Sequence, residues 1–299
     1  MRKPFSHIMD PLQVASPSSS AALSAMPYIS DLPEWDLADL YPAMDAPALQ
    51  ADLTRAAQDA ESFEAAWKGK LAAEAANKTD GGLGRAMKDY EALEELIGKI
   101  VSYAGLIYAG DTSDPQRAKL YGDIQEKMTD ASSHLLFFTL ELNQVDDQLI
   151  TDALDADPAF NHYRPWVIDL RKDKPYQLED RVEQLFHEKS VTGRGAWNRL
   201  FDETMTALRF TVDGAELTLE PTLNLLQDPD PALRQKASEA LAETFKANLR
   251  TFSLITNTLS KDREISDRWR GFEDIADARH LANRVERPVV DALAEAVQA

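Results

Sequence analysis

The chain has 299 residues, a length sufficient for one large domain or two ordinary ones. Hydrophobic residues make up 44% of the chain and charged residues 28%, which is enough apolar material for a substantial core. Its 51 acidic and 32 basic residues give a net charge of −19 without a basic stripe, which argues against a nucleic-acid partner. There is no cysteine, so disulfides, thiolate nucleophiles and Cys-ligated zinc are excluded within the chain. The acidic excess favours a role in solubility, and attraction of cationic peptides stays open as the alternative.

The N-terminal region and the hydropathy pattern bear on location. Pro and Asp residues among the first eleven positions interrupt any apolar segment of a signal peptide. No run approaches the roughly 18 apolar residues of a membrane span, so we expect no membrane partner and a cytoplasmic location. Residues 1–30, rich in Ser and Pro, are predicted to be a disordered leader, within which Met1 and Met26 are both candidate start residues.

Apolar residues then recur every three or four positions over long segments, as on the buried face of an amphipathic helix. Asp114 and Pro115 are predicted as the N-cap and first residue of the third long helix. A helix stop is expected at 270–272, whereas the last segment has no stop signal before Ala299. We predict long helices over 46–71, 83–110, 115–142 and 231–259, and shorter ones over 146–156, 158–170, 178–190 and 287–299.

One β element interrupts this helical pattern. Residues 208–212 and 216–219 alternate in polarity, and Asp213-Gly214 between them is a strong signal for a tight hairpin turn. The predicted fold is therefore mostly α, a multi-helix array of long antiparallel helices with one small β-hairpin near 208–219, on the surface of the bundle. Uneven helix lengths and the lack of a fixed repeat argue against a solenoid.

The search for catalytic chemistry gives one near match. His187 and Glu188 begin like the zinc motif H-E-x-x-H, in which two His side chains one helical turn apart hold the metal and the Glu activates a water. The second His position is Val191, which cannot bind zinc, so we predict a polar helix end before a loop at 192–195. The other four histidines have no second His at ligand spacing, and ordinary structural roles are predicted for them: His7, His134, His162 and His280.

Acidic and mixed-charge clusters have two possible interpretations. Adjacent carboxylates occur by chance among 51 acidic residues, so solvated surfaces are predicted for them. The charges of segments 261–264 and 267–270 are predicted to form ion pairs on a helix surface. The alternative is that these charged residues line a cleft.

Several segments resemble, in order and spacing, oligoendopeptidase F-type zinc metallopeptidases. Residues 35–41 are similar to the opening W-x-L-x-D-L-Y of that family, and 178–183 with 195–203 are similar to its E-x-x-L…G-x-x-A-W-x-x-L-(Y/F)-D-E region. The resemblance covers about residues 31–299. Its remaining segments are 103–104 with 111–114, then 234–237, 257–262 and 270–272, and finally 283 with 289–293.

The resemblance implies a mostly helical protein whose two halves flank a channel that admits short peptides. In the family, zinc is held by two His of H-E-x-x-H and a Glu on a later helix, and the motif Glu is the general base. This sequence lacks that motif, so no catalytic, cofactor-binding or metal-binding residue is assigned to it. We expect an N-terminal helical domain over 31–205 and the beginning of the catalytic domain over 206–299, truncated before the zinc motif.

The expected function is therefore that of the N-terminal part of a zinc-dependent metalloendopeptidase, with this part inactive and binding no zinc alone. Its expected partners are short peptides and the missing C-terminal catalytic half. The alternative is a free-standing helical binding or scaffold protein without catalytic activity.

Overall fold

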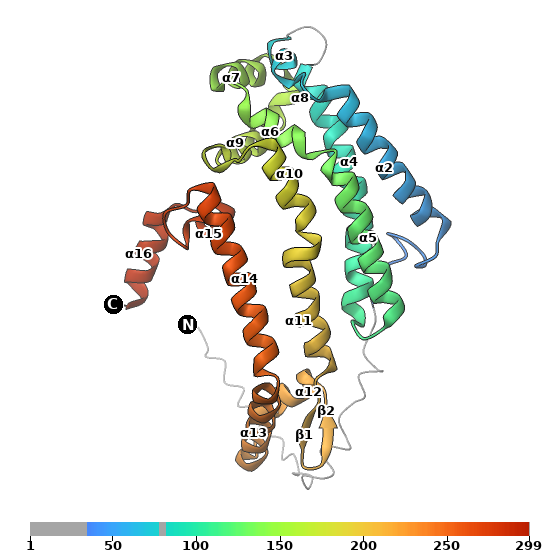
Figure 1. Cartoon of the computed structure of the whole chain (residues 1–299), viewed down its shortest axis with the longest axis vertical. Coiled ribbons are helices and arrows are strands. Elements are labelled where there is room, and N and C mark those ends of the chain that lie inside the picture. The colour runs from blue at the N-terminus through green and yellow to red at the C-terminus, as the bar shows by residue number, and fades with distance from the viewer. Residues whose placement is uncertain (1–34, 78–81, 299) are drawn as a thin grey trace, which may run out of the picture. The chain divides into compact units, whose positions relative to one another are not determined.

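The computed structural model describes residues 35–77 and 82–298, and it is mostly helical with one two-stranded antiparallel sheet in that part of the chain. The predicted leader at 1–30 and the terminal Ala299 lie outside the described residues. Figure 1 shows the elements. The α-helices are α2 (Pro47–Trp67), α3 (Leu71–Ala76), α4 (Gly82–Gly110), α5 (Pro115–Ser133), α6 (Leu136–Gln144), α7 (Asp147–Ala156), α8 (Pro158–Asn161), α9 (Arg164–Arg171), α10 (Asp180–Lys189), α11 (Ala196–Ala207), α12 (Leu219–Asn224), α13 (Pro231–Ala247), α14 (Leu249–Arg270), α15 (Asp277–Ala282) and α16 (Arg287–Gln298).

The described chain divides into two compact units. The smaller unit is 208–248, and the larger combines 35–207 with 249–298. The fold class predicted from the sequence is confirmed, whereas the domain boundary expected near residue 205 stays a prediction. None of the helices in the described ranges is long and apolar enough to cross a membrane.

The core of the larger unit lies where α2, α4 and α5 pack side by side (Figure 1). Its largest buried side chains come from these three helices, from α3, α6, α8 and α9, and from Tyr41, which precedes α2. Phe138 stacks on Tyr90 at 4.6 Å and meets Phe63 edge-on at 5.4 Å between ring centroids. Aromatic pairs in this geometry add to the stabilisation that burial alone provides.

Helix starts follow the predicted capping chemistry. The carboxylate of Asp114 accepts hydrogen bonds from the backbone N–H groups of Gln116 and Arg117 at 2.7 and 3.4 Å, and Pro115 begins α5. The predicted cap is therefore confirmed. Asp146 caps α7 in the same way, which satisfies donors that the first helical turn leaves without partners.

Two helices predicted as continuous are each divided in the structure. The predicted helix 115–142 ends at Ser133 and resumes at Leu136. Between these residues the backbone hydrogen bonds span three residues instead of four, and the hydroxyls of Ser132 and Ser133 donate to the Thr129 carbonyl. The predicted helix 158–170 is α8 followed by α9. Pro165 lies in the first turn of α9, where its missing backbone N–H costs no helical hydrogen bond, whereas inside one continuous helix it would remove a bond.

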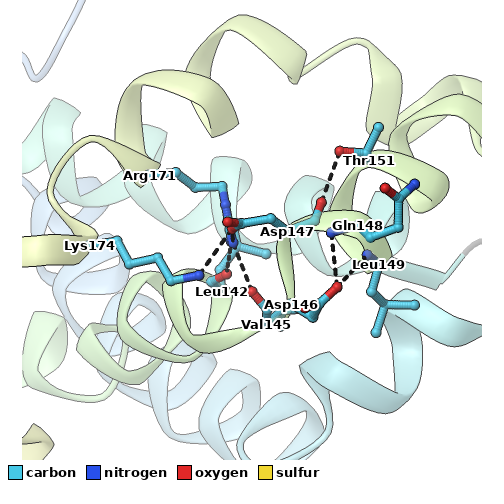
Figure 2. A network of polar contacts seen from close by, with 9 residues as sticks. All are labelled: Leu142, Val145, Asp146, Asp147, Gln148, Leu149, Thr151, Arg171 and Lys174. Atoms are coloured by element: carbon cyan, nitrogen blue, oxygen red, sulfur yellow. Dashed lines mark hydrogen bonds and ion pairs between the residues drawn. The ribbon is translucent and has the colours of Figure 1, made fainter.

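A guanidinium joins the end of α6 to the start of α7. Figure 2 shows Arg171 reaching the carbonyl oxygens of Leu142 and Val145, to which it donates at 2.7 and 2.8 Å, and the carboxylate of Asp147. Lys174 donates to the same carboxylate at 3.0 Å. The last carbonyls of α6 thus gain partners that a helix end lacks on its own.

In the smaller unit, the predicted hairpin is confirmed. Strand β1 (Phe210–Val212) pairs antiparallel with β2 (Ala215–Leu217), with Thr211 opposite Glu216. Asp213 and Gly214 both have positive φ, at 50° and 81°, as the tight turn requires. Phe210 is fully buried and its ring lies 5.5 Å from that of Phe245 in α13.

The single long helix predicted over 231–259 is wrong, since α13 ends at Ala247 and α14 begins at Leu249. Asn248 terminates α13: its backbone N–H is shared among the last carbonyls, and its side-chain amide donates to the Thr244 carbonyl at 2.9 Å. The predicted stop at 270–272 is confirmed. There Gly271 has φ +77°, and the Phe272 N–H bonds back to the Asp267 carbonyl. Short helices α3, α12 and α15, and helix α11, were not predicted.

Candidate functional site

A groove of the larger unit lies between α10–α11 and α14–α15, and we call it the α10–α14 groove. It comprises two adjoining cavities, of about 490 and 690 Å³, which share the lining residues Arg263, Ser266, Ala278 and Ala282. Volumes in this range are typical of ligand sites. We call the smaller cavity the paired section, because ion pairs line it, and the larger cavity the basic section.

The wall formed by α10 and α11 bends at a π turn, Val191–Gly195. The Gly195 N–H reaches five residues back to the Ser190 carbonyl at 2.8 Å, and Gly193 leaves helical geometry with φ −96° and ψ −115°. The loop predicted at 192–195 is therefore a helical bend that joins α10 to α11. Turns of this kind occur often at functional sites. This one brings Arg194 to the basic section.

An ion pair between α10 and α14 lines the paired section. Arg270 donates two parallel hydrogen bonds to Glu183, at 2.6 and 2.8 Å, and a third to the Tyr176 carbonyl at 3.2 Å. The Leu178 N–H also donates to Glu183 at 2.9 Å. Burial raises the pKa of Glu183, but the hydrogen bonds from Arg270 and Leu178 outweigh it and hold the pKa below its usual value. Glu183 is thus a charged, positioned carboxylate that fixes the spacing of the two helices.

Further along the paired section, two amide side chains present oxygens without partners. Asn143 is only 3% exposed, and neither its Oδ1 nor the Oε1 of Gln177 has a hydrogen-bond partner in the described structure. A buried carbonyl oxygen without a donor is costly and is uncommon in folded proteins. Asp173 and Arg284 form a second two-point ion pair at this cavity, at 2.9 and 3.1 Å. The charges of the paired section are therefore matched in ion pairs, and the two amide oxygens lie buried beneath its surface.

The basic section has a different chemistry. Lys189, Arg194 and Arg279 line it, and the side chain of none of them forms an ion pair or hydrogen bond with any other residue that the structure describes. Arg263 is the fourth cation, and it pairs with Asp267 at 3.0 Å. Asp262 is the carboxylate among these lining residues. Positive charge therefore exceeds negative charge in this cavity, although the chain as a whole is acidic.

The mixed-charge segments of α14 fit both interpretations, residue by residue. Glu264 pairs with Lys261 at 2.5 Å and with Arg268 at 3.1 Å on the exposed helix surface, as predicted. Arg263, Asp267 and Arg270 instead line the groove. The sequence of α14 alone could not show which of its charged residues face the groove, because the partner of Arg270 lies 87 residues away in the chain.

The residues present do not fit a zinc ion. His187 Nε2 lies 2.9 Å from the Ser132 hydroxyl, and the carboxylate of Glu188 accepts from Gln184 at 2.9 Å. Within 35–77 and 82–298, no group of three or more His, Cys, Asp or Glu side chains could hold a metal. His187 lies in the last turn of α10 with Ser132 as its neighbour, and no catalytic step is assigned to the near match at 187–191.

The other described histidines also have local partners. His134 Nδ1 lies 2.5 Å from the carboxylate of Glu64, at the break between α5 and α6. His134 ends α5, and its side chain is 39% exposed. His162 meets the ring of Tyr163 edge-on at 5.0 Å.

Comparison with known proteins identifies relatives of this architecture. Residues 141–210 match the family model for oligopeptidase F, a segment that includes α10, the π turn and α11. No curated protein sequence matches the chain.

Solved structures extend the likeness beyond that segment. The oligoendopeptidase-F of Enterococcus faecium shares the fold with a TM-score of 0.73 at 19% identity, over 83% of this chain and 49% of that one. A proposed peptidase from Chlamydophila abortus gives a TM-score of 0.52 at 18% identity, over 90% of this chain and 45% of that one. The chain spans about half the length of these structures. The resemblance to oligoendopeptidase F-type peptidases predicted from the sequence is thus confirmed, by the family-model match at 141–210 and by the shared fold.

Proposed function

We propose that the chain is the N-terminal part of a longer zinc-dependent metalloendopeptidase that hydrolyses short peptides inside an enclosed channel. The observation that carries this proposal is the oligopeptidase F match at 141–210, together with a fold shared with an oligoendopeptidase-F over most of the chain. The matched segment forms one wall of the α10–α14 groove. The family relation thus falls on the part of the structure that has a ligand-sized cavity.

The role proposed for residues 1–299 is to bind and enclose the peptide. The described side chains include no donor set for zinc, so we assign the metal and the bond-breaking chemistry to the C-terminal catalytic half of the longer protein. The groove supplies what peptide binding requires. It has cations for carboxylates at Lys189, Arg194 and Arg279, and it has apolar side chains. We further propose that the protein acts in the cytoplasm.

The test compares the longer protein with residues 1–299 in one assay of internally quenched peptides. We expect the longer protein to cleave peptides of about ten residues, to lose activity with a zinc chelator, and to regain it with added zinc. Residues 1–299 alone should cleave none. A longer protein that holds zinc but cleaves no peptide would refute the proposed function.

A free-standing helical binding protein is the other candidate. It predicts that residues 1–299 are stable and monodisperse without a partner. The exposed apolar side chains of α16 oppose it: Val289, Leu293 and Val297 are 57%, 66% and 80% exposed, and apolar faces of this kind are usually covered.

A further inference from the structure

Three cations of the basic section have no ion-pair or hydrogen-bond partner among the residues that the structure describes. Three of its lining side chains, Lys189, Arg194 and Arg279, project from three different elements: α10, the π turn and α15. Their convergence on one cavity is unlike the pairing elsewhere on α14, where Lys261, Arg263, Arg268 and Arg270 all have carboxylate partners. In a chain of net charge −19, carboxylates were abundant enough to pair these three cations as well.

Apolar side chains lie in the same cavity as the cations. Phe186 and Leu259 line it from α10 and α14, and Ile275, which is 94% exposed, lines it from the segment before α15. An isolated inorganic anion gains nothing from such neighbours. A ligand with an anionic group next to an apolar group uses both features.

We propose that the basic section binds the C-terminal carboxylate of a short peptide whose last side chain is apolar, with the preceding residues running into the paired section. The proposal rests on the proposed function in one respect, that the ligand is a short peptide. Arg194 and Arg279 hold the carboxylate, Lys189 adds positive charge, and Phe186, Leu259 and Ile275 contact the last side chain. Arginine suits this role because its planar guanidinium can donate two parallel bonds to a carboxylate.

The adjoining section sets the direction of the peptide. The charged side chains that line the paired section neutralise one another in ion pairs: Glu183 with Arg270, Asp173 with Arg284, and Arg263 with Asp267. Cations without partners among the described residues therefore lie in the basic section, and the anionic C-terminus of a peptide is expected at that end of the groove. The reverse orientation would place the carboxylate among guanidinium groups that already have carboxylate partners.

The test measures binding of N-terminally fluorescein-labelled pentapeptides to residues 1–299 by fluorescence polarisation. Three peptides are compared: one ending in Phe with a free carboxylate, its C-terminal amide, and the amide with an internal Glu. We expect the free acid to bind about tenfold more tightly than the amide, since each partly exposed charge pair contributes a factor of roughly two to five. The internal Glu should restore little of that difference.

Variants locate the effect in the groove. Arg194→Gln and Arg279→Gln should each weaken binding of the free acid by roughly two- to fivefold and leave the amide unchanged, and the double variant should bind both alike. Arg181→Gln is the matched control: Arg181 is an exposed arginine on the same α10 helix and outside the groove. Arg181→Gln should bind the free acid and the amide with the same affinities as the wild type.

The outcomes separate this proposal from the proposed function. Equal binding of acid and amide, full rescue by the internal Glu, or an equal effect of Arg181→Gln would overturn the carboxylate site, and none of these results depends on catalysis. Absence of peptide hydrolysis by the longer protein would overturn the proposed function and leave the acid–amide comparison standing.

Discussion

The ion pair between Glu183 and Arg270 should be the strongest polar link between α10 and α14. Replacing Glu183 by Gln keeps the shape of the side chain and one acceptor oxygen, but removes its charge. The Glu183 side chain is 11% exposed and that of Arg270 is 25% exposed, so the variant leaves a guanidinium largely out of water and without its counter-ion. We therefore expect the substitution to destabilise the larger unit of the chain.

The magnitude follows from the geometry. Removing one partner of a fully buried ion pair costs about 3–5 kcal/mol, and a hydrogen bond to a charged group contributes roughly 1.5–3 kcal/mol. Because Arg270 keeps a quarter of its surface in solvent and Gln retains one bond, we expect Glu183→Gln to lower the free energy of unfolding by about 2 kcal/mol. Arg270→Gln should cost a similar amount, and the double variant should cost about 1 kcal/mol less than the sum.

The assay is urea unfolding followed by circular dichroism at 222 nm for the wild type, both single variants and the double variant. Glu264→Gln on α14 is the control, because its ion pairs with Lys261 and Arg268 lie on the exposed surface and it should leave the midpoint unchanged. Additive effects of the two groove variants, or single effects no larger than that of Glu264→Gln, would refute the account of this pair.

Four further outcomes are expected. Hydrogen bonding holds the pKa of Glu183 below its usual 4.5, so the stabilisation that its carboxylate provides is present above pH 4.5 and is lost as the pH falls through the folded-state pKa. The urea midpoints of the wild type and of Glu183→Gln should therefore converge below pH 4.5. A difference between the two midpoints that stays constant down to about pH 3 would contradict this. Asp114→Ala should destabilise α5 by about 1 kcal/mol, whereas Asp114→Asn should be nearly neutral in the same unfolding assay. Gly271→Ala should cost about 1 kcal/mol from backbone geometry alone, because φ is +77° and no atom lies within 4 Å of the added methyl group. Hydrogen exchange should be fast throughout α16, none of whose residues is buried, and strong protection there would show that its apolar face is covered.

The helices could be predicted where the periodicity of the apolar residues and the capping residues indicated the same helix ends. Asp114 with Pro115, and Asp213 with Gly214, are local signals whose geometry is decided by the residues themselves, and the structure has both. The division between α13 and α14 was missed because the apolar spacing from Leu233 to Leu259 continues across Asn248 without a Gly or Pro. Asparagine at a helix C-terminus was the available signal, and it was weaker than the period.

The groove could not be predicted in the same way. Glu183 and Arg270 are far apart in sequence, and each belongs to a helix whose charged residues are mostly exposed. The missing partners of Asn143 and Arg194 depend on the whole fold around them, since a sequence does not show which polar atoms remain unsatisfied. The family resemblance placed 178–183 and 195–203 in a region of interest and implied a channel, but it did not indicate which residues line the groove.

The central proposal is that residues 1–299 form the peptide-enclosing part of an oligopeptidase and that the metal chemistry resides elsewhere in a longer protein. The most direct measurement is the zinc content of purified residues 1–299 by plasma mass spectrometry, after incubation with zinc and removal of loosely bound metal. The account predicts far less than one zinc per chain. One tightly held zinc per chain, lost on replacement of His187, would contradict it.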